Sequence, residues 1–314
     1  MPARLWAVVF AICVSMAVQF SAAQAASNHL GSSLASRTPQ GTRLINDIEY
    51  GQVRGISLRM DASIPAGPGK FPAVIIVHGG GWVTGDRRSN VEPLFRPLSN
   101  AGFAWFSISY RLATDLTHFG SAINDVEQAV RFIKSNASDY HVDPQRIALL
   151  GESAGGQLAA MAALHRDPDT SVKAVVALYA PSDLVSLARS SEYIPSSIRD
   201  SIRGTPWEGL VLAGLAQLSP INSVRSDMPP FLLIHGTADA LIPFEQSKEM
   251  CARMREAGAS CELYPVEGGG HGIRWWESFP KLAAGYKEKL VTWLGRTLGS
   301  GGSVAPLPQR LAGS

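Results

Sequence analysis

The pattern of hydrophobic and polar positions along this chain alternates between strand-like and helix-like segments, which predicts a layered α/β fold. Several short segments are almost continuously apolar, which is typical of strands that are buried on both faces of a parallel sheet. They span residues 73–77, 104–108, 147–150, 172–178, 231–234 and 263–266. Helical patterns lie between them, most clearly over 123–135, where apolar residues recur at helical spacing. The chain is therefore expected to form an α/β fold with a mostly parallel, doubly wound sheet.

Two stretches depart from this alternation. Residues 44–53 and 55–62 show strand-like patterns joined by a short turn, so an antiparallel pair is expected to open the domain. Residues 185–227 contain no strong strand, only short amphipathic pieces interrupted by proline and glycine. An insertion at this point would lie over the carboxyl edge of the sheet, where ligands bind in such folds. We interpret it as a small cap insertion in a single domain that spans residues 44–298.

Both ends of the chain are expected to lie outside this domain. The apolar run 5–18 is too short to span a bilayer, and residues 23–25 form an A-x-A cleavage site. This pattern predicts a secretory signal peptide over residues 1–25, with export to the periplasm or the exterior and no stable membrane anchor after cleavage. An uncleaved anchor is the alternative. Residues 26–43 are predicted to be a polar leader, and 299–314 a disordered tail rich in Gly, Ser and Pro.

The overall composition narrows the class of protein. Of the 314 residues, 46% are apolar and 17% are charged, which describes a globular protein with a substantial core. The net charge is only +2, and no cluster of Lys and Arg stands out. Nucleic acid is therefore not expected as a partner.

Cysteine usage adds one structural expectation. Cys13 lies within the predicted signal peptide, so only Cys251 and Cys261 would remain in an oxidising compartment. A helical pattern covers residues 244–257 and a strand-like pattern covers 261–266. If the chain folds back between them, the two cysteines come level, and we predict a disulfide; two free thiols are the alternative.

The centre of the predicted chemistry is the segment GESAGG at residues 151–156. It follows the apolar run 146–150 and precedes 157–164, whose composition favours a helix. A G-x-S-x-G motif between a strand and a helix is typical of a nucleophile elbow, in which a tight turn exposes the serine hydroxyl. We therefore predict that Ser153 is a nucleophile, while an ordinary glycine-rich turn is the alternative.

A second glycine-rich motif, HGGGW at residues 78–82, directly follows a predicted strand. Its glycines leave backbone N–H groups able to turn toward a developing oxyanion, which preorganised donors stabilise. Gly80 and Gly81 are the predicted donors, and the N–H of Ala154 would complete the oxyanion hole. We expect His78 to brace this loop through hydrogen bonds rather than to act as an acid or base.

A serine nucleophile needs a base, and the base needs an acid that orients it. His271 lies in a glycine-rich loop after one predicted strand, and Asp239 comes just past another. The chain order Ser153, Asp239, His271 is the order expected of an α/β-hydrolase. Asp227 and Glu245 are the rival acids, but neither follows a strand as directly.

Several motifs resemble those of a known family. From residue 45 to 298 the sequence is similar to the α/β-hydrolase esterases of the HGGG type, which include hormone-sensitive-lipase-like and bacterial acetyl- or feruloyl-esterase relatives. The matching stretches lie at residues 78–82, 85–86, 110–112, 143–144, 151–156, 229–239 and 270–272. The resemblance implies an α/β-hydrolase fold and a serine carboxylesterase, with Ser153 as nucleophile, His271 as base and Asp239 as acid. It also implies the oxyanion donors named above.

The chain departs from the family at positions near the expected substrate pocket. Ser109 stands where the family usually has Asp, and Gln157 replaces a frequent histidine. These departures bear on substrate preference rather than on catalysis. Trp82 and Gln157 are candidates for lining the pocket. Trp275 and Trp276 are further candidates, with core or surface packing as the alternative.

The predicted reaction is hydrolysis of carboxylic esters through an acyl-enzyme. The sequence has no metal-ligand cluster or phosphate-binding loop, so no cofactor and no metal are expected. Export and the family resemblance suggest a small-molecule or saccharide ester as substrate, with short acyl groups, acylated sugars or plant-wall esters as examples. An amidase or formamidase using the same triad is the alternative, followed by a non-catalytic binding module. Nothing in the sequence indicates an oligomeric state.

Overall fold

The computed structural model of the protein describes residues 41–113, 116–190, 203–205 and 208–299. The predicted signal peptide, nearly all of the predicted leader, and the predicted tail beyond residue 299 lie outside these ranges. The first strand begins at Thr42, so the domain starts slightly earlier than residue 44. Within the described ranges, no helix is both long enough and apolar enough to cross a membrane.

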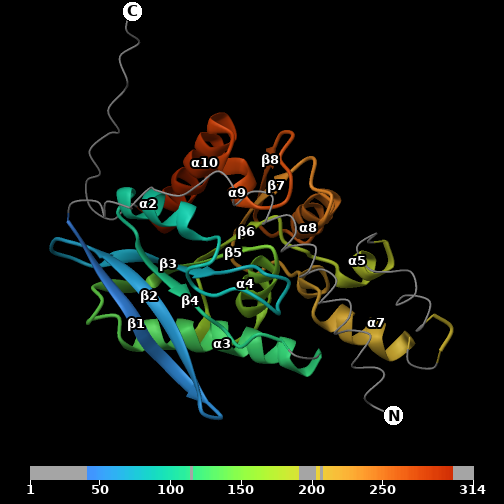
Figure 1. Cartoon of the computed structure of the whole chain (residues 1–314), viewed down its shortest axis with the longest axis horizontal. Helices are drawn as coiled ribbons and strands as arrows, with labels where there is room; N and C mark the ends of the chain where they lie inside the picture. Colours follow the sequence, from blue (N-terminus) through green and yellow to red (C-terminus); the bar gives the residue numbers. More distant parts are fainter. Residues whose placement is uncertain (1–40, 114–115, 191–202, 206–207, 300–314) are drawn as a thin grey trace, which may run out of the picture.

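A single sheet of eight strands forms the centre of the domain, in the order β1-β2-β4-β3-β5-β6-β7-β8 (Figure 1). The strands are β1 (Thr42–Val53), β2 (Ile56–Pro65), β3 (Phe71–Val77), β4 (Ala104–Ile108), β5 (Val142–Glu152), β6 (Ala174–Leu178), β7 (Phe231–Gly236) and β8 (Cys261–Val266). β1 pairs with β2, and β2 with β4, in antiparallel fashion, whereas every pair from β4 to β8 is parallel. The predicted antiparallel opening pair and mostly parallel sheet are confirmed. β5 is longer than expected, because its first residue, Val142, pairs with Phe71.

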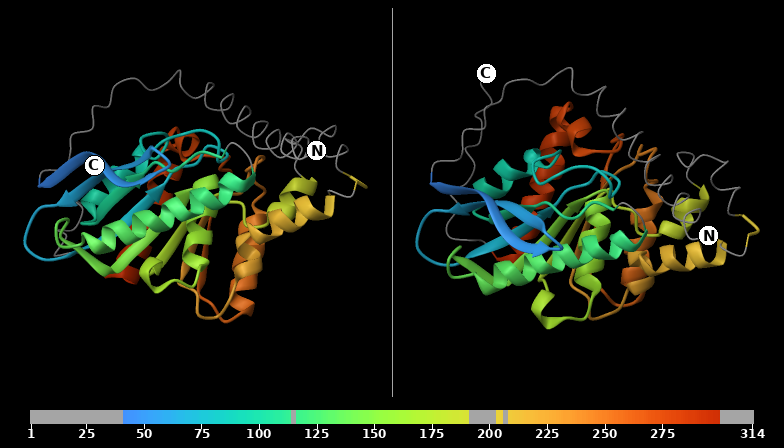
Figure 2. Two further views of the ribbon diagram at one scale, coloured as in Figure 1. Left: turned by 90° about the horizontal axis from the view of Figure 1, so that it is seen from below. Right: turned by 60° about the horizontal axis from the view of Figure 1, so that its bottom comes forward.

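Helices cover both faces of the sheet, as Figure 2 shows from two further sides. One face is covered by α2 (Glu92–Asn100), α9 (Ile273–Glu277) and α10 (Pro280–Leu298), and the other by α3 (Leu116–Ser135), α4 (Ala154–Leu164) and α8 (Glu245–Glu256). The central strand β3 shows why its sequence is apolar throughout. Val74 and Ile76 point into a first core, beneath α2, α9 and α10. Ile75 and Val77 point into a second core, beneath α3, α4 and α8. Because both faces are buried, an apolar side chain is needed at every position.

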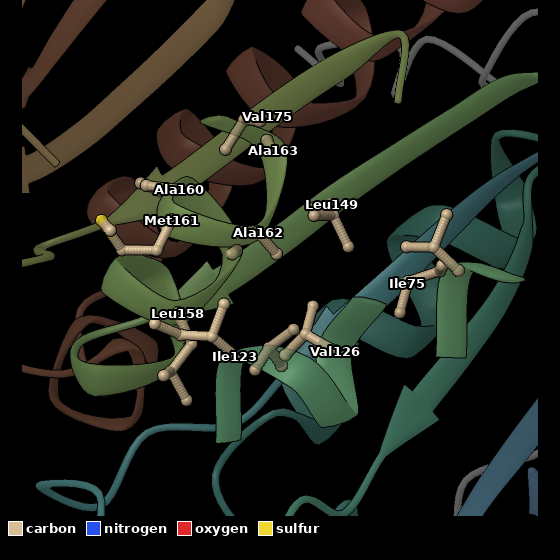
Figure 3. Packing of buried hydrophobic residues seen from close by; sticks show 14 of the residues in the cluster. Ile75, Ile123, Val126, Leu149, Leu158, Ala160, Met161, Ala162, Ala163 and Val175 are labelled. Carbon is tan, nitrogen blue, oxygen red and sulfur yellow. The ribbon is translucent and has the colours of Figure 1, made fainter. Parts of the chain in front are cut away.

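Helix α4 lies at the middle of the second core, against β5, β6 and α3. Figure 3 shows Leu158 of this helix beside Ile123 and Val126 of α3. All of its residues from Ala154 to Leu164 are buried, so the helix has no polar face. Its small side chains let it lie close to the sheet. This packing holds the turn before α4 rigidly in place, which positions the predicted nucleophile.

The described part of the predicted cap interval is helical. It contains α5 (Leu184–Ser190), α7 (Glu208–Gln217) and a 3-10 turn, Pro220–Ser223. α5 and α7 contact each other, and the 3-10 turn contacts α4 and α8. In Figure 1 the two helices lie beyond one end of the α/β layers. Their role as a cap over a substrate stays a prediction.

The predicted disulfide is present in the structure. Cys251 of α8 and Cys261 of β8 are bonded, with their Cα atoms 5.4 Å apart. After α8 ends, Gly258 has a φ of +80°, a left-handed conformation that glycine adopts readily. This turn sends the chain back along the helix, so the two cysteines come level as expected.

Candidate active site

Ser153 occupies the tight turn between β5 and α4. Its φ of 51° is unusual for a residue other than glycine, and its N–H donates to Leu178 O at 2.8 Å. The turn also requires glycine behind it, because a Cβ on Gly155 would lie 2.2 Å from the carbonyl oxygen of Val77. The sequence motif thus forms the strained elbow that was predicted, with the serine between strand and helix.

His271 connects Ser153 to Asp239. Its Nε2 lies 3.0 Å from Ser153 Oγ, and its Nδ1 lies 2.7 Å from Asp239 Oδ2. The histidine follows β8 and the aspartate follows β7, so both come from loops at the carboxyl edge of the sheet. The structure therefore brings the three predicted residues together in a single hydrogen-bonded row.

Asp239 is held as an anion. Burial by itself would raise its pKa, but the facing His271, with hydrogen bonds from His235 and His271, outweighs burial and lowers the pKa well below the usual range. The other carboxylate oxygen, Oδ1, accepts the N–H groups of Leu241 and Ile242, each at 2.9 Å. All its acceptor sites are thus engaged, which fixes the carboxylate in one orientation.

His235 is a second histidine beside this carboxylate, and the sequence did not suggest a role for it. Its Nε2 lies 2.9 Å from Ile242 O and 3.4 Å from Asp239 Oδ2, while its Nδ1 lies 2.7 Å from Ser247 Oγ. With a proton on Nε2, the ring donates to Ile242 O and faces Asp239 Oδ2, while Nδ1 accepts from the Ser247 hydroxyl. The ring therefore supports the loop that carries Asp239.

The rival acids lie elsewhere. Asp227 pairs with Arg225 and its side chain is 65% exposed, and Glu245 is 64% exposed near Lys248. Neither has a contact with His271 among the described residues. The geometry thus favours Asp239, as predicted.

The glycine loop after β3 has the backbone that the motif suggested. Gly80 has a φ of +109° and Gly81 a φ of +58°, and Gly80 O accepts the N–H groups of Val83 and Thr84 at 3.2 and 3.0 Å. Within the described ranges, the N–H groups of Gly80, Gly81 and Ala154 have no hydrogen-bond acceptor assigned outside regular secondary structure. The role of these three groups as oxyanion donors stays a prediction.

His78 braces this loop. Its Nδ1 lies 2.7 Å from Gly79 O, and its ring stacks on that of Tyr110 with centroids 4.3 Å apart. Burial lowers the pKa of His78 to about 4, so the ring is neutral at physiological pH. The expectation that this histidine supports the loop agrees with these contacts.

The four candidates for the pocket differ in their surroundings. Trp82 Nε1 donates to Gln157 Oε1 at 2.9 Å, and Gln157 Nε2 donates to Leu218 O at 2.7 Å, so the two residues tie the glycine loop to the end of the cap interval. Trp276 is fully buried and belongs to the core, which makes the packing interpretation correct for it. Trp275 is 38% exposed. Whether Trp82 and Gln157 line a substrate pocket stays a prediction.

Two residues at this edge of the sheet carried no assignment from sequence. Glu152 precedes the nucleophile, and Tyr179 directly follows β6; the tyrosine hydroxyl donates to the glutamate carboxylate. The sequence feature that could have pointed to Glu152 is a charged residue inside an otherwise apolar segment.

Within the described ranges, no group of three or more His, Cys, Asp and Glu side chains is arranged to hold a metal ion.

Comparison with known proteins finds similarity to a protein family and to several proteins that are named esterases. The model of the family described as BD-FAE matches residues 60–254. Esterase LipQ of Mycobacterium tuberculosis is 33% identical over 63% of this chain and 49% of its own length, and esterase LipC of the same organism is 33% identical over 64% and 53%. The chain thus spans about half the length of these curated relatives.

Solved structures extend the similarity over more of the chain. A truncated carbohydrate esterase from gut microbiota has a TM-score of 0.68 at 26% identity, covering 85% of this chain and 99% of its own. The apo form of Thermogutta terrifontis esterase 2 has a TM-score of 0.66 at 25% identity, covering 85% and 98%. With the sheet and elbow described above, these matches establish an α/β-hydrolase fold, and the chain belongs to the BD-FAE family.

Proposed function

We propose that this protein is a serine carboxylesterase. The observation that carries the proposal is the position of the His271 ring, whose two nitrogens lie 3.0 Å from Ser153 Oγ and 2.7 Å from Asp239 Oδ2. This is the arrangement of nucleophile, base and orienting acid that acyl transfer requires. The esterase names of the family relatives support the same reaction class.

In the proposed reaction, His271 removes the proton of Ser153 as Oγ attacks the carbonyl carbon of the ester. The N–H groups of Gly80, Gly81 and Ala154 stabilise the tetrahedral oxyanion. As the oxyanion collapses, the bond to the alcohol oxygen breaks, and the imidazolium gives its proton to the departing alcohol. Water then attacks the acyl-enzyme with the same histidine as base, which releases the acid and restores Ser153.

Asp239 keeps the histidine in the tautomer that this reaction needs. Its carboxylate accepts a hydrogen bond from the Nδ1–H group, which leaves the lone pair of Nε2 directed at the serine hydroxyl. The same negative charge stabilises the imidazolium while it exists. The lowered pKa of Asp239 means that it stays ionised over the whole neutral range.

The proposed substrates are esters with short acyl groups, including acylated sugars, and the proposed location is outside the cytoplasm. Two structural neighbours support the substrate class: one is named a carbohydrate esterase, and another is an esterase with butyrate bound. The apolar run followed by A-x-A at the amino terminus supports export.

The test compares wild type with Ser153→Ala on p-nitrophenyl acetate and on the matched anilide. Wild type should hydrolyse the ester much faster than the anilide, and a fluorophosphonate probe should label Ser153. The alanine variant should lose both activity and labelling while its circular dichroism stays unchanged. Substantial hydrolysis by Ser153→Ala would refute the assignment, and faster cleavage of the anilide would make the protein an amidase.

A further inference from the structure

A buried chain of hydrogen bonds joins the glycine loop to the histidine loop through Glu152. Gly79 N–H donates to Glu152 Oε1 at 3.1 Å, and the Tyr179 hydroxyl donates to Oε2. The same hydroxyl accepts the N–H of Ile273 at 3.0 Å. Glu152 is 1% exposed and directly precedes the nucleophile. Three segments of the proposed active site are thus tied to one side chain.

The contacts fit the ionised form of Glu152. Both carboxylate oxygens face donors, the N–H of Gly79 and the O–H of Tyr179. A proton on Oε1 would oppose the Gly79 N–H. A proton on Oε2 would oppose the hydrogen of the Tyr179 hydroxyl, which would then have to turn away from the carboxylate. The hydroxyl would lose Glu152 as the acceptor of its hydrogen, while the hydroxyl oxygen would still accept from the N–H of Ile273. Protonation therefore breaks the chain at one end or the other.

The charge of Glu152 lies close to the proposed base. The edge of the Tyr179 ring packs against the His271 ring with centroids 4.7 Å apart, and Glu152 interacts electrostatically with His271. The other titratable groups that interact with Glu152 are Glu92, Tyr110, Tyr179 and Tyr286, all neutral or anionic.

The electrostatic balance at this site depends on the histidine. Burial outweighs the hydrogen bonds from Tyr179 and Gly79 and the nearby His271, which act in the opposite direction, so the pKa of Glu152 lies above its ordinary value. Among the described residues, the groups that shift the pKa of Glu152 are Tyr179, Gly79, His271 and Glu92, and of these only His271 can become a cation. The imidazolium that forms during the reaction would therefore be attracted by this buried carboxylate.

We propose that Glu152 is a positioning residue for the acyl transfer proposed above, on which this inference rests. Together with Tyr179 it fixes the glycine loop and the histidine loop relative to Ser153, and its negative charge stabilises the imidazolium of His271. Its position beside the nucleophile lets one residue serve both the oxyanion side and the base side of the site. Glu152 itself exchanges no proton with the substrate.

The experiment separates charge from shape with two variants. Glu152→Gln keeps the size and removes the charge, and Glu152→Asp keeps the charge but is too short to reach both donors. Both should lower kcat on p-nitrophenyl acetate at least tenfold, with KM changed less than threefold, because positioning acts on the transition state. Tyr179→Phe should lower kcat similarly, because it removes the link to Ile273.

The pH profile of kcat/KM distinguishes the two variants. In Glu152→Gln the acid limb should move to lower pH by about half a unit or more, because the imidazolium has lost its anionic neighbour. In Glu152→Asp the acid limb should stay where it is in wild type. A residue that only holds the fold together would lower activity in both variants without separating their acid limbs.

Glu277 provides a matched control. It also accepts a hydrogen bond from a tyrosine, Tyr286, at 2.6 Å, but among the described residues none of its hydrogen bonds reaches the glycine loop. Glu277→Gln should keep kcat within threefold of wild type and leave the pH profile unchanged. Thermal melts of every variant verify that the fold is retained at the assay temperature.

The outcomes separate this inference from the proposed function. If Glu152→Gln keeps kcat within threefold of wild type, or if its acid limb coincides with that of Glu152→Asp, the inference is wrong and the proposed esterase function is unaffected. If wild type neither hydrolyses esters nor reacts with a fluorophosphonate at Ser153, the proposed function itself fails. A tenfold loss in Glu152→Gln together with the shifted acid limb supports the inference.

Discussion

Asp239→Asn is the substitution that most directly tests the proposed base. In the structure, Asp239 Oδ1 accepts the N–H groups of Leu241 and Ile242, each at 2.9 Å. An asparagine that keeps these two bonds must place its amide nitrogen where Oδ2 lies, 2.7 Å from His271 Nδ1. The amide can only donate there, so Nδ1 becomes the acceptor and the proton moves to Nε2, facing Ser153.

This wrong tautomer removes the lone pair that should accept the serine proton. The substitution also removes the charge that stabilises the imidazolium. The corresponding change in a serine protease lowers kcat by about 10⁴. We expect a loss of about two to four orders of magnitude in kcat here, which corresponds to about 3–5.5 kcal/mol of barrier. KM should change much less, because Asp239 does not contact the substrate.

The assay is hydrolysis of p-nitrophenyl acetate, with Asp227→Asn and Glu245→Gln as controls. These carboxylates are 65% and 64% exposed, so their substitution should leave kcat within about tenfold of wild type. Thermal melts check that the variants are folded. The Tm of Asp239→Asn should stay close to that of wild type, because the asparagine oxygen can keep the two backbone hydrogen bonds. An active Asp239→Asn together with an inactive control variant would show that the acid has been assigned to the wrong residue.

Three further predictions test the scaffold. Replacing Cys251 and Cys261 by alanine should cost about 2–3 kcal/mol of stability, measured as a lower Tm, and intact-mass analysis of unreduced wild type should show no alkylated thiol. Because His78 has a pKa of about 4 in the fold against 6.5 for an ordinary histidine, stability should fall as pH falls through this window, by up to about 3 kcal/mol, and His78→Gln should flatten that fall in urea titrations. Gly155→Ala, whose Cβ would lie 2.2 Å from a β3 carbonyl oxygen, should abolish soluble expression or lower Tm sharply, whereas Gly209→Ala, with open space around it, should not.

Much of the fold could be predicted from the sequence, because the patterns that indicate its strands and helices lie within short segments. A strand buried on both faces is apolar at nearly every position, so β3 and β6 were visible as unbroken runs and β4 as a run interrupted only by Ser107. β5 was predicted too short, because its start contains Asp143 and Pro144 and pairs only with the beginning of β3. Such a start is stabilised by a neighbouring strand and not by its own composition.

The proposed site was predictable in part for the same reason. Ser153 and the glycine loop were visible from motifs that serve a local backbone requirement, and His271 and Asp239 from their places after strands. Glu152 and Tyr179 were missed, because the hydrogen bonds of Glu152 reach Gly79 and Tyr179, which lie 73 and 27 residues away in the chain. No local pattern records a partner at that distance.

The sequence by itself determined the alternation of strands and helices, the elbow at Ser153 and the chain order of the three candidate residues, because each depends on neighbouring residues or on the order of strands. Only the tertiary structure decided which side chains meet. His271 and Ser153 are 118 residues apart in the chain and 3.0 Å apart in space. Such contacts depend on the order and twist of the strands and on the helices packed against them. The binding of Asp239 by two histidines and the role of Glu152 therefore became visible only once the sheet was assembled.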